Sequence, residues 1–194
     1  MKKQDNTSTS QMPKTGRIGR FIKILQPETE ENTLIEILEN AGNYDALNAE
    51  EKSAWWKKAV EKTESRLGQE KAVQVMKKCG SKCCGNGQRA TAKRIYAESE
   101  SLQDFLDKIS KHDVRDGDLK YHLENENIII AEHNKCFCKQ VANTMERFNN
   151  ITYCQCSVEF NKQFFTAALA KEVQVELLQS IICGAKSCKF RITI

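Results

Sequence analysis

The pattern of apolar and polar residues changes about two thirds of the way along the chain. Up to residue 112, apolar side chains recur every three or four positions, which is the period of an amphipathic α-helix. After residue 117, apolar and polar residues alternate in short stretches, which is the period of a half-buried β-strand. The sequence therefore predicts an α+β fold, with a mainly helical N-terminal half packed on a C-terminal antiparallel sheet and a long helix.

Several helices of the N-terminal half have recognisable ends. Asn48 and Glu51 form the pattern of a capping box, and the helix that they open is predicted to stop at Gly68. Glycines further along favour a loop over residues 79–87. The other predicted helices are a segment from Pro27 to near Gly42, residues 69–78, residues 88–97, and a short helix opened by Ser101 and Asp104.

The C-terminal part is predicted to hold four strands, which brings the total to four strands and six or seven helices. Alternation of apolar and polar residues on both sides of a turn indicates a β-hairpin, and this signal occurs twice. The predicted elements are a hairpin of residues 119–123 and 128–131, a short helix over 140–148, a long helix capped by Ser157, and a hairpin of 173–177 and 190–194 around a turn at 184–187.

The chain is long enough for one domain behind a polar N-terminal tail. Residues 1–14 have too little apolar surface to favour an ordered structure, and we predict a flexible basic tail over residues 1–23. A single α+β domain is predicted over residues 24–194, mainly helical over 24–112 and built from sheet and helix over 113–194. No signal peptide and no apolar run long enough to span a membrane is visible, which predicts a cytoplasmic protein.

The net charge of +4 comes from the predicted tail. The first 23 residues carry six basic side chains against one acidic side chain, so the remainder is close to neutral. A nucleic-acid binder needs a basic footprint on its folded part, and the sequence therefore predicts neither nucleic-acid nor membrane partners. The oligomeric state is not determined by the sequence, although a homodimer is compatible with it.

The chain contains nine cysteines, and these are its main candidates for a chemical role. Their odd number, without a secretion signal, argues against a complete disulfide framework and favours metal binding, redox chemistry or plain burial. Two C-x-C pairs, Cys136 with Cys138 and Cys154 with Cys156, together offer four thiolates suited to tetrahedral zinc or to an Fe–S cluster. The alternatives for these four residues are structural burial and redox pairing.

Two further groups of cysteines have different surroundings. Cys83 and Cys84 lie near basic residues and just before a predicted helix, where a thiolate is stabilised, so either residue is a candidate catalytic nucleophile. Cys79 precedes them by one helical turn. The alternatives to a nucleophile in this group are a share in a metal site or a loop without a chemical role. Cys183 and Cys188, on the last hairpin, form a rival metal-ligand set or pack as buried hairpin residues.

Aromatic side chains on the long helix are candidate ligand-binding residues. Phe160, Phe164 and Phe165 recur at helical spacing, and such a stripe more often packs in a core. The same stripe can also wall an apolar pocket between helix and sheet. No Walker A, G-x-G-x-x-G, G-x-S-x-G or H-E-x-x-H motif occurs, so those mechanisms have no support.

The last 40 residues carry a family resemblance. The run Tyr153–Ser157, the aromatic helix, the strand at 173–177 and the run Gly184–Ile192 resemble the end of the 4-vinyl reductase-like (hydrocarbon-binding) domains. The same features resemble the L-2-amino-thiazoline-4-carboxylic acid hydrolase-like proteins. This resemblance implies a pocket between helices and sheet for a small, often apolar molecule. It also implies zinc near that pocket in some relatives, held by cysteines matching Cys188 and Cys154 or Cys156.

Two positions depart from the family pattern. Ser180 stands where an intermediate cysteine is expected, and Glu159 stands where a small residue is frequent. The cysteines and the resemblance together lead to three hypotheses about function. The first is a small-molecule-binding or sensing protein with a structural or pocket-adjacent zinc. The second is a hydrolase of a small cyclic C–N or C–S substrate, and the third is an Fe–S or thiol redox protein.

Overall fold

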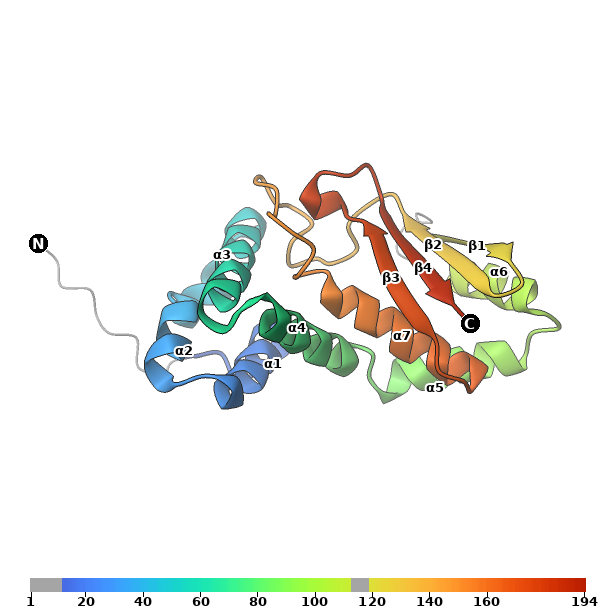
Figure 1. The fold of residues 1–194 in the computed structure, drawn as a ribbon, viewed down its shortest axis with the longest axis horizontal. Helices are drawn as coiled ribbons and strands as arrows, with labels where there is room; N and C mark the ends of the chain where they lie inside the picture. The colour runs from blue at the N-terminus through green and yellow to red at the C-terminus, as the bar shows by residue number, and fades with distance from the viewer. Residues whose placement is uncertain (1–11, 113–118) are drawn as a thin grey trace, which may run out of the picture.

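The computed structural model describes residues 12–112 and 119–194, and it confirms the predicted α+β class. Over these residues the chain forms seven α-helices and four strands, with five of the helices before residue 100 and all strands after residue 118 (Figure 1). The helices are α1 (Gly16–Leu25), α2 (Glu31–Ile37), α3 (Ala49–Leu67), α4 (Gln69–Cys83), α5 (Asn86–Ala97), α6 (Leu102–His112) and α7 (Gln155–Leu169). The strands are β1 (Leu119–Asn125), β2 (Ile128–His133), β3 (Gln174–Gln179) and β4 (Cys188–Thr193), and short 3-10 turns cover Gln26–Glu28, Ala41–Ala46 and Ile181–Cys183.

Helix α1 corrects the predicted extent of the N-terminal tail. Residues 16–23 form most of this helix, and Ile18, Phe21, Ile22 and Leu25 on one of its faces are buried. The Phe21 ring packs edge-on against Trp56 of α3, with ring centroids 5.1 Å apart. The tail prediction rested on charge, but four apolar side chains at helical spacing outweigh a few surface charges. Residues 1–11 lie outside the described part of the chain.

Helix α3 has the predicted cap. The Asn48 side chain accepts hydrogen bonds from the backbone N–H groups of Glu50 and Glu51, each at 3.0 Å. The Glu51 carboxylate accepts the Asn48 N–H in return at 2.8 Å. The helix stops before Gly68, which has a φ of +83° that other residues adopt only with strain.

Helix α4 continues beyond its predicted end at residue 78. It runs through Cys79 and Gly80 to Cys83, and α5 begins at Asn86, so only residues 84 and 85 of the loop predicted over residues 79–87 lie outside a helix. Glycine inside a helix costs about 1 kcal/mol relative to alanine, which is why the sequence pattern favours a stop there. A tertiary contact requires glycine here, because α4 crosses α7 at this point and leaves no room for a side chain.

The four strands form one antiparallel sheet in the order β1-β2-β4-β3. Its core face carries apolar residues in register across all strands, for example Ile129 beside Ile192 and Ile192 beside Val175. Helix α7 packs against β3 and helix α6 against β1, so helices cover this face (Figure 1). Both predicted hairpins are present, as β1 paired with β2 and β3 paired with β4, and β2 also pairs with β4 in the centre of the sheet.

The segment between β2 and α7 contains turns instead of the short helix predicted over residues 140–148. Tertiary hydrogen bonds hold it: the Ser53 hydroxyl donates to the Gln140 carbonyl at 3.2 Å, and the Phe148 N–H donates to the Ile182 carbonyl at 2.8 Å. Helix α7 then begins at Gln155, so Ser157 lies inside its first turn and the predicted capping role is wrong.

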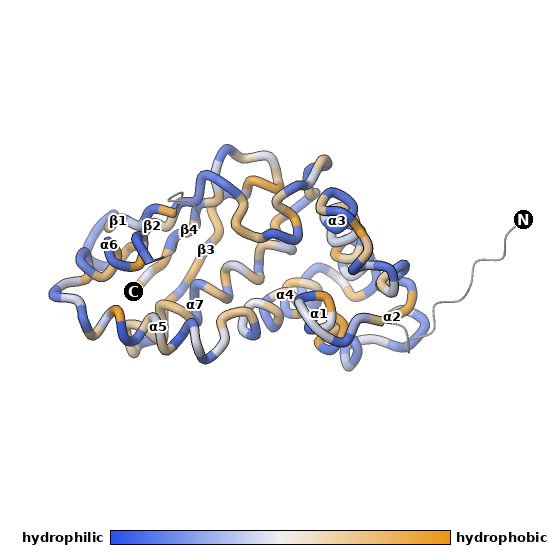
Figure 2. The backbone as a smooth tube through the Cα atoms, turned by 180° about the vertical axis from the view of Figure 1, so that it is seen from behind, coloured by the Kyte–Doolittle hydropathy of each residue, from blue (hydrophilic) through white to orange (hydrophobic). Residues whose placement is uncertain are grey.

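Apolar and polar positions are interspersed along the chain (Figure 2). In the part of the chain that the structure describes, no helix is both long and apolar enough to cross a membrane.

Candidate functional site

The nine cysteines all lie in described parts of the chain, and none of them forms a disulfide. They come from three places: the end of α4, the segment from Cys136 to the start of α7, and the connection between β3 and β4. Figure 1 shows that the start of α7 lies beside α4 and below the β3–β4 connection. The fold therefore gathers cysteines that are more than 100 residues apart in sequence around the N-terminal end of α7.

Helices α4 and α7 approach each other closely at Gly80. A Cβ atom built on Gly80 would lie 2.2 Å from the carbonyl oxygen of Cys156, a distance that real Cβ atoms do not show. Cys79 and Cys83 lie on either side of Gly80 in α4 and, being four residues apart, share one face of the helix, and both interact electrostatically with Cys156. The glycine thus brings two α4 cysteines next to Cys156 in the first turn of α7.

Arg17 of α1 reaches into this cluster. Its Nη2 donates a hydrogen bond to the Cys156 sulfur at 2.8 Å. Its guanidinium lies over the rings of Trp56 and Tyr153, 5.8 and 5.3 Å from their centroids, which are cation–π distances. The residue as a whole is half-buried, but its Nε atom is fully buried and has no hydrogen-bond acceptor among the described residues.

The titratable groups around Arg17 are thiols and a phenol. No carboxylate in residues 12–112 or 119–194 forms an ion pair with it. Burial by itself lowers the pKa of Arg17, but the potential negative charge of Cys156, Tyr153 and Cys138 turns the net shift of its pKa upward. Burial likewise raises the pKa of Cys156, and Arg17 opposes that shift.

Tyr153 links this cluster to the aromatic core of the helical half. Its hydroxyl and the Cys138 sulfur are hydrogen-bonded at 3.0 Å, and its ring contacts Trp56 at a centroid distance of 5.6 Å. The Trp56 indole N–H donates to the Tyr44 hydroxyl at 2.8 Å, and this hydroxyl donates to the Gln140 side chain. Burial holds the pKa of Tyr153 well above its ordinary value, so the phenol is neutral.

The four cysteines of the predicted metal set take different partners. Cys156 faces Arg17 and Cys138 faces Tyr153, while the Cys154 sulfur lies 3.2 Å from the Ser180 hydroxyl. Burial raises the pKa of Cys136 to about 12. Within the described residues, no three Cys, His, Asp or Glu side chains lie close enough together to hold a metal ion. A cation at Cys156 would also meet the positive charge of Arg17. The zinc and Fe–S sites stay predictions.

Cys183 and Cys188, the second predicted metal pair, also have separate partners. The Cys183 thiol donates to the Asn150 carbonyl at 3.1 Å, and the Cys188 sulfur accepts the Ile181 N–H at 3.4 Å. Burial raises the pKa of both thiols. Cys183 therefore ties the loop between β3 and β4 to the segment before α7, and Cys188 satisfies a backbone group of that loop.

The two candidate nucleophiles differ in their surroundings. Cys84 is fully buried, and burial raises its pKa to about 11, which keeps it as the unreactive thiol near neutral pH. Cys83 is half-exposed at the end of α4, and Arg20 Nη2 lies 3.7 Å from its sulfur. The adjacent residues thus present one shielded thiol and one accessible thiol beside a cation.

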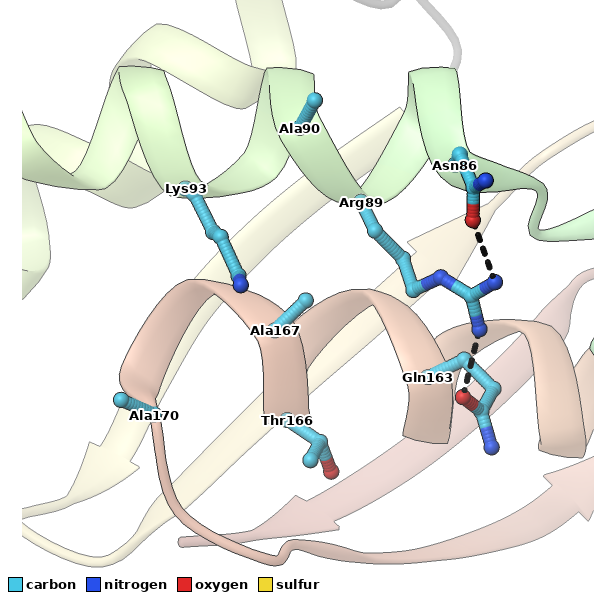
Figure 3. A pocket seen from close by; sticks show the side chains of 8 residues that line it. All are labelled: Asn86, Arg89, Ala90, Lys93, Gln163, Thr166, Ala167 and Ala170. Atoms are coloured by element: carbon cyan, nitrogen blue, oxygen red, sulfur yellow. Dashed lines mark hydrogen bonds between the residues drawn. The ribbon is translucent and has the colours of Figure 1, made fainter.

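A separate pocket of about 550 Å³ lies between α5 and α7. It carries two cationic side chains, Arg89 and Lys93, both from α5 (Figure 3). Arg89 Nη1 donates to Gln163 Oε1 and Nη2 to Asn86 Oδ1, each at 3.1 Å, so the guanidinium is held between the helices. The lining residues are Asn86, Arg89, Ala90, Lys93, Gln163, Thr166, Ala167 and Ala170, and none of them is acidic.

The aromatic residues predicted to bind a ligand lie elsewhere on α7. Phe165 is fully buried and packs edge-on against Phe105 and Tyr121, with centroid distances of 6.1 and 5.7 Å. Phe160 and Phe164 are half-buried and stacked, 6.3 Å apart. None of the three lines the pocket between α5 and α7. Their role as ligand-binding residues stays a prediction.

The sequence alone does not assign the cations of these two sites to their roles. Arg17 belongs to the predicted tail, although Ile18, Phe21, Ile22 and Leu25 follow it at helical spacing and indicate an amphipathic helix. The spacing of Arg89 and Lys93, four residues apart on one helix face, was likewise available. No local signal indicates that α7 packs against that face, because this contact is tertiary.

The model of a family of unknown function, DUF6144, matches residues 19–194. The chain belongs to this family. The matched region contains all nine cysteines, the α4–α7 crossing and the pocket between α5 and α7, whereas Arg17 lies just before it. No curated protein and no solved structure matches the chain. Because the function of the DUF6144 family is unknown, the match does not bear on the vinyl reductase-like resemblance, which stays a prediction.

Proposed function

We propose that this DUF6144 protein binds a small anionic molecule in the pocket between α5 and α7. One observation carries the proposal: two cations, Arg89 and Lys93, face a pocket of about 550 Å³ whose lining residues include no acid. This volume lies within the usual range for small-molecule sites. The excess of positive charge selects a ligand that carries a carboxylate, phosphate or sulfonate group.

The geometry of Arg89 supports such a role. Asn86 and Gln163 hold its guanidinium with hydrogen bonds from both sides (Figure 3), so little conformational entropy is lost when an anion binds. A guanidinium can bind a carboxylate or phosphate through two parallel hydrogen bonds. Lys93 adds a second positive charge one helical turn away, on the same face of α5.

The rest of the lining favours binding over covalent chemistry. Ala90, Ala167 and Ala170 leave room for the body of a ligand, and Thr166 supplies a hydroxyl for orientation. None of the lining residues is a cysteine or histidine. We therefore favour a binding or sensing protein over a hydrolase for this pocket. We place it in the cytoplasm, since nine free thiols suit a reducing compartment.

Calorimetric titration and thermal shift assays with inorganic phosphate, citrate and a nucleoside monophosphate test the proposal. At least one of these probes is expected to bind and to raise the melting temperature. Arg89→Gln and Lys93→Gln should each weaken that binding by about tenfold or more, because each removes a charge-assisted hydrogen bond.

Arg94→Gln is the matched control. Arg94 lies on the same helix but is exposed and paired with Glu98 at 2.8 Å, so its loss removes one charge without altering the pocket. Equal loss of affinity in Arg94→Gln and Arg89→Gln would show a diffuse charge effect and contradict a built site. Absence of binding for all three probes at millimolar concentration would also contradict the proposal.

A further inference from the structure

The cysteines around the start of α7 differ sharply in accessibility and charge environment. Cys79 and Cys84 are buried, and burial raises their pKa values to about 12 and about 11. Cys183 is half-exposed, but its thiol donates to a backbone carbonyl, and among the described residues no cation donates a hydrogen bond to its sulfur. Cys83 alone of the described cysteines combines partial exposure with a guanidinium at hydrogen-bonding distance to sulfur.

Arg20 of α1 lies beside Cys83, with its Nη2 3.7 Å from the sulfur. Arg17, one helical turn earlier on α1, interacts with Cys83 electrostatically. Neighbouring cations stabilise a thiolate, which is the form that attacks peroxides and electrophiles. The Nε of Arg17 is buried and has no acceptor in the described chain. The positive charge of this guanidinium acts on the surrounding thiols, and no carboxylate of the described residues cancels it.

Cys156 is a second thiol in this cluster, and it lies beside Arg17. Cys156 accepts the hydrogen bond from Arg17 Nη2 and lies across the α4–α7 crossing from Gly80. Because Cys83 is one helical turn after Gly80 on the same face of α4, the close approach of Gly80 to Cys156 brings the Cys83 side chain toward Cys156, and both thiols interact electrostatically with Arg17. An accessible thiol and a buried thiol therefore share one cation.

We propose that Cys83 is a peroxide-reactive thiol and that Cys156 is its resolving partner. In the first step the Cys83 sulfur attacks a hydroperoxide, the O–O bond breaks, and Cys83 sulfenic acid and water (or an alcohol) form. In the second step the Cys156 sulfur attacks the sulfenic sulfur, the S–O bond breaks, and water leaves with the Cys156 proton. The product is a disulfide between α4 and α7, and a dithiol reductant restores both thiols.

The test uses the full chain, reduced and then treated with stoichiometric hydrogen peroxide. Free thiols are blocked with an alkylating agent, and the digest is analysed by mass spectrometry without reduction. A peptide pair that links Cys83 to Cys156 is expected and should disappear on treatment with dithiothreitol. In Cys156→Ser the sulfenic acid at Cys83 should persist long enough to be trapped with dimedone.

Alkylation rates test the role of the cations. Cys83 should react with iodoacetamide about tenfold faster than Cys183, and Arg20→Gln should slow Cys83 several-fold. Lys23→Gln is the matched control, because it removes the same charge from the same helix at a residue that donates no hydrogen bond to a sulfur of the described residues. A circular dichroism spectrum of each variant verifies that the fold is intact.

Three results would overturn the proposal: Cys83 that stays reduced, Cys83 linked to another cysteine, or Cys183 alkylated as fast as Cys83. An unchanged rate in Arg20→Gln would likewise remove the charge argument. This test is independent of the anion pocket, since it monitors only the thiols.

Discussion

Arg17 and Cys156, which are 139 residues apart in the sequence, are joined by a hydrogen bond of 2.8 Å between Nη2 and sulfur. This contact ties the first helix of the chain to the first turn of α7. It places a cation among thiols and aromatic rings, with no carboxylate partner in the described chain. Arg17 therefore stabilises the fold mainly through packing and cation–π contact, and less through ion pairing.

Truncation of Arg17 should therefore destabilise the protein mainly through lost packing. We expect Arg17→Ala to lower the free energy of unfolding by about 2–3 kcal/mol, because it removes the contacts with Trp56 and Tyr153 and leaves a cavity. Arg17→Met, which fills similar space without a buried charge, should stay within about 1 kcal/mol of the wild type. Urea unfolding followed by tryptophan fluorescence measures both. A larger loss in Arg17→Met than in Arg17→Ala would contradict this explanation.

Gly80 offers a test of the α4–α7 crossing. Alanine is normally the better helix residue, but a Cβ at position 80 would lie 2.2 Å from the Cys156 carbonyl oxygen. Gly80→Ala should thus destabilise the fold by about 2 kcal/mol or more, since the two helices must move apart. The control is Gly87→Ala in α5, where no atom lies within 4 Å of the added Cβ. It should gain about 0.5–1 kcal/mol. Denaturant unfolding of the two variants should show opposite signs.

The capping box of α3 predicts a modest and specific effect. Asn48→Ala removes the acceptor for two backbone N–H groups and should lower the free energy of unfolding by about 1 kcal/mol. Asn48→Asp keeps a side-chain oxygen acceptor in place and should be nearly neutral. Equal losses in the two variants would show that the cap is not the cause. Chemical denaturation provides the measurement.

The buried thiols predict a loss of stability at alkaline pH. In the folded state burial raises the pKa of Cys79 to about 12, whereas an exposed cysteine titrates near 8.5. Above about pH 8.5 the unfolded chain loses the proton while the folded chain keeps it, so deprotonation favours unfolding. The stabilisation is fully present below that pH and is lost as the pH rises toward the folded value.

Urea unfolding between pH 7.5 and 10.5 under reducing conditions measures this loss. Each buried thiol contributes a slope of up to about 1.4 kcal/mol per pH unit in the upper part of that range. Cys79→Ala should reduce the slope by the share of one thiol, although its absolute stability is lower because of the cavity. A slope unchanged in Cys79→Ala would show that this thiol titrates alike in the folded and unfolded chains.

The sequence by itself determined the elements whose signals are local. The cap of α3 depends on Asn48 and Glu51, three residues apart, and the strands depend on strict alternation such as that of Phe190, Ile192 and Ile194. Neighbouring residues decide such features, and the α+β class follows from their order along the chain.

Only the tertiary structure decided the features that depend on contacts between distant segments. Helix α4 continues through Gly80 because α7 needs that close approach, and α1 is ordered because its apolar face meets Trp56. The candidate sites have the same origin. The nine cysteines were visible in the sequence, but which of them lies beside Arg17, beside Arg20 or beside neither depends on helix packing, which no local pattern encodes.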